Sequence, residues 1–346
     1  MNRKRTWRLA ALASTAAIVT VTAAACSSSS SSSPSSAAAA GSGSSPSSSS
    51  GSGKHYTIAY VPGATGVAFY DTLVSGMKAK AATLGMTVLY QGSPDFAPSA
   101  QTPVVDAMCT RHPNALVVSP TDPVAMAPAI STCLNAGIPV ITVDTGLTNT
   151  SQLTSAITTD NLSGGKDAAD FVGKALGGKG EVALMSLSPT ATTQVERIQS
   201  FQKEIKAAYP GITVLPVQYT TQDTSDSESV ARSILAAHPG VKAFFGSAEP
   251  NAEGVADALK ALSLTGKVLN VGFDASPAEV SLLKSGGINA TIAQPAAEEG
   301  ADAAQFAYDK ITGNTGGITA SVQLPDVLLT TADASQSADQ KYFYIP

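Results

Sequence analysis

The sequence contains little of what metal sites and most enzyme active sites are built from. Only three of its 346 residues are cysteine and three are histidine, and it has no CxxC pair and no HExxH segment. It also has no GxSxG motif, no Walker-type loop and no GxGxxG motif after a strand-like segment. These arrangements hold zinc, nucleotides and catalytic nucleophiles in many enzymes. The sequence therefore predicts no metal site, no cofactor and no enzyme activity.

Positive charge and tryptophan are scarce as well. The formal net charge is −5, and it becomes −9 when the first 26 residues, with four basic and no acidic side chains, are left out. Nucleic-acid binding depends on clustered Lys and Arg, so this acidic chain is not expected to bind DNA or RNA. The only tryptophan, Trp7, lies in the same segment. Phe and Tyr must therefore supply any aromatic contacts in the mature protein.

The first 26 residues have the features of an export signal. They begin with the basic stretch MNRKRTWR, continue with a weakly apolar stretch, and end in TAAAC, where small residues precede Cys26. This order is typical of a cleaved signal. The segment resembles a bacterial lipoprotein signal, which implies that Cys26 carries lipid and anchors the protein at the outer face of the cell membrane. An ordinary cleaved signal with an incidental cysteine is the alternative.

Residues 27–53 are almost entirely Ser, Ala, Gly and Pro and include no charged side chain. Such a segment cannot bury enough apolar surface to fold, and a flexible coil of this length spans about 28 Å on average. We interpret residues 27–53 as a tether between the membrane and a folded module.

Two further cysteines, Cys109 and Cys133, remain if Cys26 carries lipid. Exported proteins permit disulfides. Each of the two residues lies late in one of two consecutive helical segments, so a disulfide between them is geometrically possible, and we expect it. Two separate buried thiols are the alternative.

From Lys54 onward, short β-branched runs alternate with longer amphipathic segments. In residues 69–85, for example, Leu73, Met77 and Ala81 recur at helical spacing. Glycine follows several of these segments, where it favours the end of a helix. We predict strands at residues 56–61, 86–91, 115–120, 139–144, 181–186, 213–219, 242–247, 267–273 and 290–294.

Repeated strand–helix units predict an α/β fold of parallel sheets with helices on both faces. About ten units fit two doubly wound lobes better than one wide sheet. In such sheets ligands bind beyond the C-terminal ends of the strands. The polar and aromatic side chains at these ends are Phe69, Tyr70, Asp122, Asp144, Asp160, Asn161, Gln222, Asp223, Glu249, Asp274 and Gln294.

The order of these segments resembles the type I periplasmic binding proteins, the sugar-binding components of ABC importers of the ribose and galactose class. The resemblance runs from about Tyr56 to Leu329. It rests on FYDTLVSGMKAKAATLG, VVSPTDPVAMAPAI, AGIPVITVD, TTDNLSGGKDAADFV, AAHPGVKAFF, VGFDASP and ATIAQPAAEEGADAA, in the order that the family shows. It implies a monomer that binds a sugar or sugar-like polyol between two lobes and delivers it to an ABC permease with its ATPase.

The family fold also implies three crossings between the lobes, near Thr159, Gln294 and Val322. The parts that we expect are residues 1–26 as signal peptide and lipobox cysteine, 27–53 as tether, 54–159 with 295–322 as the N-terminal lobe, 160–294 with 323–332 as the C-terminal lobe, and 333–346 as a C-terminal tail.

The resemblance further implies which side chains contact the ligand. In the family an aromatic pair packs on the sugar, an aspartate from each lobe accepts hydrogen bonds from its hydroxyls, and a glutamine lies at a crossing. The expected ligand contacts here are Phe69, Tyr70, Asp144, Gln222, Phe273, Asp274 and Gln294.

Some positions depart from the family pattern. Thr145 and Val195 stand where ribose binders have arginine, and Ala248 stands where they have asparagine. These differences argue against ribose itself and favour a ligand that is less hydroxylated, larger or differently oriented.

Asp274 could instead be a helix cap, since a helix is expected directly after it. However, Ser276, Pro277 and Glu279 already form the pattern of a capping box. We therefore expect Asp274 to face the cleft, with a local turn as the alternative. For Asp144 the alternative is an Asx-turn.

Two other functions fit the same pattern. A pair of carboxylates across a cleft could hydrolyse glycosides if they lie roughly 5 to 9 Å apart, a distance that the sequence does not give. A sensor for a membrane receptor or kinase would share every ligand contact with a transport protein. Carboxylates and aromatic rings suffice to bind neutral polyols, so we favour the transport function.

Overall fold

The computed structural model describes residues 55–336 and 340–345. The export signal, Cys26 and the tether lie outside the described residues, so the signal peptide, the lipid anchor and the tether stay predictions. The described residues belong to one compact unit, Gly53–Pro346. None of the helices in the described ranges is long and apolar enough to span a membrane.

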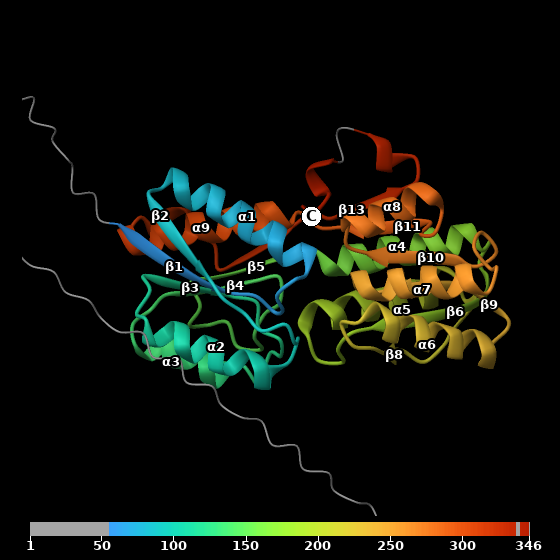
Figure 1. Ribbon diagram of the computed structural model, residues 1–346, viewed down its shortest axis with the longest axis horizontal. Coiled ribbons are helices and arrows are strands. Elements are labelled where there is room, and N and C mark those ends of the chain that lie inside the picture. The colour runs from blue at the N-terminus through green and yellow to red at the C-terminus, as the bar shows by residue number, and fades with distance from the viewer. Residues whose placement is uncertain (1–54, 337–339, 346) are drawn as a thin grey trace, which may run out of the picture. The chain divides into compact units, whose positions relative to one another are not determined.

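A first sheet holds six parallel strands in the order β12-β5-β4-β3-β1-β2 (Figure 1). Two of its inner strands, β3 and β4, are short apolar runs that are buried along their whole length, as expected for a sheet covered on both faces. Its strands are β1 (Tyr56–Val61), β2 (Met86–Tyr90), β3 (Ala115–Val118), β4 (Val140–Val143), β5 (Ser155–Thr159) and β12 (Ser321–Leu324).

A second sheet follows the order β13-β11-β10-β9-β6-β7, with the short strand β8 paired to β6. All of its pairs are parallel except that of β13 with β11. Its strands are β6 (Lys179–Ser186), β7 (Gly211–Val214), β8 (Gln218–Tyr219), β9 (Val241–Gly246), β10 (Leu269–Phe273), β11 (Ala290–Ala293) and β13 (Val327–Thr330).

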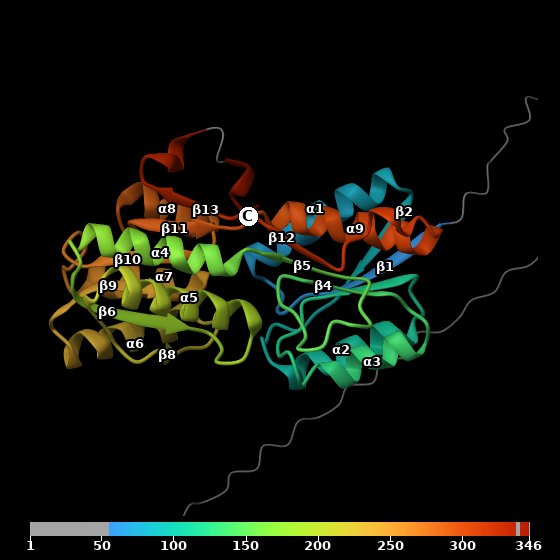
Figure 2. The same ribbon diagram turned by 180° about the vertical axis from the view of Figure 1, so that it is seen from behind.

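Helices cover both faces of each sheet. Figures 1 and 2 show α1 beside α9 on one face of the first sheet, and α2 beside α3 on the other. The helix pairs α4–α5 and α6–α7 cover the second sheet in the same way. The helices are α1 (Ala68–Thr83), α2 (Pro98–Thr110), α3 (Ala127–Asn135), α4 (Asn161–Ala175), α5 (Thr192–Ala208), α6 (Thr224–Ala237), α7 (Glu249–Ala261), α8 (Pro277–Ser285) and α9 (Ala296–Thr312), and short 3-10 turns lie at Thr315–Gly317, Asp333–Ser335 and Gln340–Tyr342.

The predicted fold class, two doubly wound α/β lobes, is confirmed. We call the first sheet with α1, α2, α3 and α9 the first lobe, and the second sheet with α4 to α8 the second lobe. Cys109 of α2 and Cys133 of α3 form a disulfide on the first lobe. The close contact of α1 with α9 depends on glycine, because a Cβ on Gly300 would lie 2.0 Å from the carbonyl oxygen of Leu73.

The chain passes between the lobes three times, each time at the C-terminal end of a strand. The crossings follow β5, β11 and β12. The last one lies at residues 325–326, so the expected boundary between residues 322 and 323 falls inside β12 and needs correction. Because the chain enters the second sheet here at the C-terminal edge of that sheet, β13 must run antiparallel to β11.

Two further expectations differ from the structure. The predicted strand at residues 213–219 is two strands, β7 and β8, since Pro216 between them cannot donate a ladder hydrogen bond. The expected tail at residues 333–346 is not a loose end in its described part, because Ala334 and Tyr344 are buried.

Candidate functional site

Asp144 and Asp274 occupy equivalent places in the two lobes. Asp144 follows β4 and Asp274 follows β10, both at the C-terminal edge of a sheet. Both have positive φ angles, +62° and +101°, a region in which aspartate is more frequent than most residues. A threonine hydroxyl from the neighbouring strand donates to each backbone carbonyl, Thr158 to Asp144 at 2.8 Å and Thr291 to Asp274 at 2.7 Å. Each lobe thus places one aspartate, with the same backbone conformation and the same threonine contact, directly after a strand at the C-terminal edge of its sheet.

Among the described residues, one side chain donates a hydrogen bond to the Asp144 carboxylate: the Tyr70 hydroxyl, at 2.8 Å from Oδ2. Burial of Asp144 raises its pKa to about 6, although the nearby charge of Arg197 and the bond from Tyr70 oppose the shift. An ionised carboxylate offers about four acceptor positions. Most of those on Asp144 therefore remain for a ligand.

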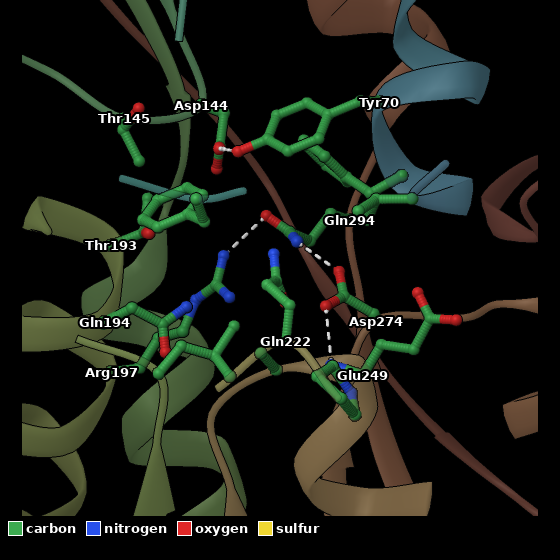
Figure 3. A pocket seen from close by; sticks show the side chains of 16 residues that line it. Tyr70, Asp144, Thr145, Thr193, Gln194, Arg197, Gln222, Glu249, Asp274 and Gln294 are labelled. Carbon is green, nitrogen blue, oxygen red and sulfur yellow. Dashed lines mark hydrogen bonds between the residues drawn. The ribbon is translucent and has the colours of Figure 1, made fainter. Parts of the chain in front are cut away.

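The Asp274 carboxylate is held much more firmly by the protein. Its Oδ1 accepts from Gln294 Nε2 at 2.5 Å and from the Tyr344 hydroxyl at 2.9 Å. Its Oδ2 accepts from the backbone N–H of Glu249, the first residue of α7, at 3.1 Å (Figure 3). With about four acceptor positions on a carboxylate, Asp274 has one left, on Oδ2.

The predicted capping box after Asp274 is confirmed. Ser276 accepts from the backbone N–H of Glu279, and the Glu279 carboxylate accepts from the backbone N–H of Ser276. Asp274 therefore does not cap α8. The sequence did not indicate that it would bond to the start of a different helix, α7.

Arg197 of α5 fixes Gln294 at the second crossing. Its Nη2 donates to Gln294 Oε1 at 2.8 Å, its Nε to Asn161 Oδ1 at 2.6 Å, and its Nη1 to the carbonyl of Ser247 at 2.9 Å. Since Gln294 Oε1 faces a guanidinium, the Gln294 amide nitrogen must point to Asp274, and the orientation of the amide follows from this network. One N–H of Gln294 remains for a ligand.

Phe273 does not take the place expected of it. Its ring is fully buried in the core of the second lobe, and the guanidinium carbon of Arg197 lies 3.6 Å from the ring centroid. Side chains alternate between the two faces of a strand, so Phe273 points into the layer of α4 and α5. It supports Arg197 and does not line the cavity.

A cavity between the lobes brings the other six expected side chains together, as Figure 3 shows for five of them. It encloses about 430 Å³ of space free of protein atoms, part of it open to solvent. Phe69 and Tyr70 of α1 pack edge to face, with ring centroids 5.2 Å apart. The expected residues that line it are Phe69, Tyr70, Asp144, Gln222, Asp274 and Gln294.

The cavity has further lining residues that the sequence did not single out as ligand contacts. Thr193 and Gln194 come from the start of α5, which lies at the C-terminal edge of the second sheet, and Phe96 comes from the loop before α2. Gln194 Oε1 accepts from the hydroxyls of two buried serines, so its amide nitrogen is left for other partners. The rule that ligands bind beyond the C-terminal ends of the strands applies to the start of α5 as well, since α5 follows β6.

Glu249 and Arg197 also line the cavity. Burial, and then the charges of Asp274 and Glu253, raise the pKa of Glu249 to about 8. Glu249 is therefore mostly protonated near neutral pH and can donate a hydrogen bond. Among the residues described, no group of three or more His, Cys, Asp or Glu side chains could hold a metal ion.

Comparisons with known proteins agree with this architecture. Residues 58–315 match the family model described as periplasmic binding protein domain. The ribose import binding protein of Salmonella typhimurium is 33% identical over 258 residues, which are 74% of this chain and 84% of that protein. The D-apiose import binding protein of Actinobacillus succinogenes is 29% identical over 250 residues, 72% of this chain and 80% of that protein.

Solved structures show the same fold. An ABC transporter solute-binding protein from Agrobacterium vitis, bound with α-D-tagatopyranose, has a TM-score of 0.81 at 33% identity and covers 84% of this chain and 100% of its own. A carbohydrate transporter solute-binding protein from Agrobacterium radiobacter, in complex with D-arabinose, has a TM-score of 0.79 at 25% identity and covers 84% of this chain and 99% of its own.

Proposed function

Because the chain belongs to the periplasmic binding protein family, whose members bind solutes and are not enzymes, we propose that it captures a sugar or sugar-like polyol for an ABC importer. The observation that carries this proposal is the cavity itself, in which one carboxylate from each lobe and an aromatic pair face the same space. Carboxylates bind hydroxyl groups through hydrogen bonds of about 1.5 to 3 kcal/mol each. The apolar face of a sugar ring packs on aromatic side chains. The relatives named above for ribose and apiose support the same class of solute.

The two carboxylates would have unequal roles. Asp144 keeps most of its acceptor positions and would take two neighbouring hydroxyls of the solute, whereas Asp274 would take one through Oδ2. Gln294 and Gln222 would contribute amide hydrogen bonds, and Phe69 with Tyr70 would pack against the ring. Thr145, which stands where ribose binders have arginine, lines the cavity, and this difference would favour a solute other than ribose. Val195, the second such position, does not line the cavity, whereas Arg197 of the same helix does.

The proposed mechanism is closure of the two lobes around the solute. A ligand that bonds to Asp144 in one lobe and to Asp274 in the other stabilises the closed arrangement, because both bonds can form only when the lobes meet. The three crossings are the segments that would bend. The closed form would then be the one that the permease recognises.

We also propose that the protein is held at the outer face of the cell membrane by lipid on Cys26. The support is the sequence TAAAC behind a basic and apolar start, followed by the uncharged segment 27–53. Mass spectrometry of the mature N-terminus tests this directly. Release of Cys26→Ser protein into the medium is expected, and membrane retention of that variant would contradict the anchor.

A thermal-shift screen tests the solute class. The panel would include D-ribose, D-tagatose, D-arabinose and D-allose, together with disaccharides, polyols and nucleosides. A ligand at 100 times its dissociation constant adds about 2.7 kcal/mol to the free energy of unfolding, which gives a clear rise in Tm. Absence of any shift across the panel would contradict the proposal. Appearance of a hydrolysis product from a glycoside would favour the carboxylate-pair enzyme instead.

A further inference from the structure

The described end of the chain, Gln340–Ile345, returns to the edge between the two lobes. After β13 the chain passes the 3-10 turn Asp333–Ser335, where Ala334 is buried against the second lobe. Tyr342 and Phe343 pack, partly buried, on the same apolar cluster. The segment is thus anchored to the second lobe before it reaches the crevice.

Tyr344 and Ile345 contact both lobes. In the second lobe, the Tyr344 backbone N–H donates to the carbonyl of Ala275 at 3.0 Å, and its hydroxyl donates to Asp274 Oδ1 at 2.9 Å. In the first lobe, the Tyr344 ring packs edge to face on Phe69 with centroids 5.7 Å apart, and the Ile345 N–H donates to Thr72 Oγ1 at 2.9 Å. The segment therefore links the lobes at a place distinct from the three crossings.

Tyr344 supports the site from behind and does not line the cavity. It is 4% exposed. Burial and the charge of Asp274 hold the pKa of Tyr344 well above its usual value, so its hydroxyl keeps its proton and always acts as a donor to the carboxylate. Its bond occupies the second acceptor position of Oδ1, and Oδ2 is left as the oxygen with a position for a solute.

We propose that Gln340–Ile345 is a fourth connection between the lobes, and that Tyr344 is a positioning residue that holds Asp274 for the solute. The positioning role of Tyr344 toward a solute rests on the proposed sugar-binding function. The connection between the lobes does not depend on it. Contacts to Phe69 and Thr72 exist only while the lobes lie as they do in this structure, so they favour this arrangement over an opened one.

Four proteins test the proposal: the wild type, Tyr344→Phe, Tyr344→Ala and the matched control Tyr342→Phe. Tyr344→Phe removes the hydroxyl and keeps the ring on Phe69. Tyr342→Phe makes the same chemical change two residues away, where no residue in the described part of the chain hydrogen-bonds to the side chain. Small-angle X-ray scattering without sugar measures how far the lobes open, and calorimetry with D-tagatose and D-arabinose measures affinity.

Tyr344→Phe is expected to keep the radius of gyration of the wild type and to have a lower Tm, since a buried hydrogen bond to a charged group is lost. It is also expected to bind sugar about tenfold more weakly, because Asp274 loses a donor that holds it in place. Tyr344→Ala is expected to raise the radius of gyration without sugar and to weaken binding further. Tyr342→Phe is expected to match the wild type throughout. Equal affinity of Tyr344→Phe and wild type would overturn the positioning role, and an unchanged radius of gyration for Tyr344→Ala would overturn the connection.

If no sugar binds the wild type, the proposed sugar-binding function fails. The connection between the lobes and the positioning of Asp274 by Tyr344 can still be tested. The scattering comparison then decides the connection alone. A crystal structure of sugar-free Tyr344→Phe decides the positioning role, because Asp274 is expected to leave its rotamer or to occupy several. An Asp274 side chain that is unchanged in that structure would refute it.

Discussion

Replacement of each cleft aspartate by asparagine separates the structural role of the carboxylate from its role in binding. Both Asp144 and Asp274 have positive φ angles, +62° and +101°. Asparagine tolerates this backbone region nearly as well as aspartate, whereas alanine would add strain. Asp144→Asn and Asp274→Asn therefore remove the charge and one acceptor oxygen and leave the backbone in place.

The expected magnitudes follow from the internal partners of each side chain. Three protein donors face Asp274, and an amide can satisfy them with only one oxygen, so at least one bond to a charged group is lost in Asp274→Asn. That loss lowers the free energy of unfolding by about 2 kcal/mol or more. Asp144 has the Tyr70 hydroxyl, which can donate to an amide oxygen as well. Because burial already penalises the ionised form of Asp144, its replacement is expected to leave the stability of the sugar-free protein at pH 7 unchanged or slightly higher.

Both variants are expected to lose affinity for sugar, by about tenfold to a hundredfold for each hydrogen bond of 1.5 to 3 kcal/mol. Urea unfolding at pH 7 without sugar measures stability, and isothermal calorimetry measures affinity. The contrast between the two variants is the decisive result. Equal losses of stability, or a greater loss in Asp144→Asn, would refute the unequal roles of the carboxylates.

Three further expectations concern pH and packing. Affinity for sugar should fall about tenfold from pH 7 to pH 5, because Asp144 has a pKa of about 6 and must be ionised to accept, and Asp144→Asn should flatten the calorimetric profile. Burial raises the pKa of Glu299 from its ordinary 4.5 to about 8, so the contribution of Glu299 to stability is complete below about pH 4.5 and is lost as the pH rises through 8. Melting curves should show a Tm that declines over this pH range, and the decline should be smaller in Glu299→Gln. Gly300→Ala should lower the free energy of unfolding by about 1 to 3 kcal/mol in urea titrations, because its Cβ would meet the Leu73 carbonyl, whereas Gly317→Ala, with nothing near its Cβ, should not.

The sequence predicts those residues of the site whose position follows from the strand in which they lie or which they follow. Asp144 and Asp274 follow buried strands. Because ligands bind beyond the C-terminal ends of parallel strands, both residues are predicted to line the binding cavity, as they do in the structure. Phe273 precedes Asp274 by one residue, and the alternation of side chains along a strand sends it to the core instead. The expectation that Phe273 contacts the ligand could have been avoided, because the alternation of side chains along the strand can be counted in the sequence.

Other features depend on contacts between distant segments, which no local pattern encodes. Tyr344 lies 70 residues after its partner Asp274, in a segment without helical or strand periodicity. Arg197 and Gln294 lie 97 residues apart, and only the folded chain shows that the arginine orients the amide. The strand pattern predicted the two lobes but missed β12, which is short and polar. The family resemblance placed the last crossing near Val322, a few residues before the end of that strand.

The bonding of Arg197 has a consequence for the charge of acceptable solutes. Three of the five N–H donors of its guanidinium are engaged with Asn161, Ser247 and Gln294, and Arg197 is the one Lys or Arg among the described residues that line the cavity. Its single positive charge faces the two carboxylates of Asp144 and Asp274, so these three side chains together carry a net negative charge when both aspartates are ionised. A phosphorylated or oxidised sugar would be disfavoured by this charge, and the transport system would draw on neutral carbohydrate, leaving any phosphorylation to the cell interior after import.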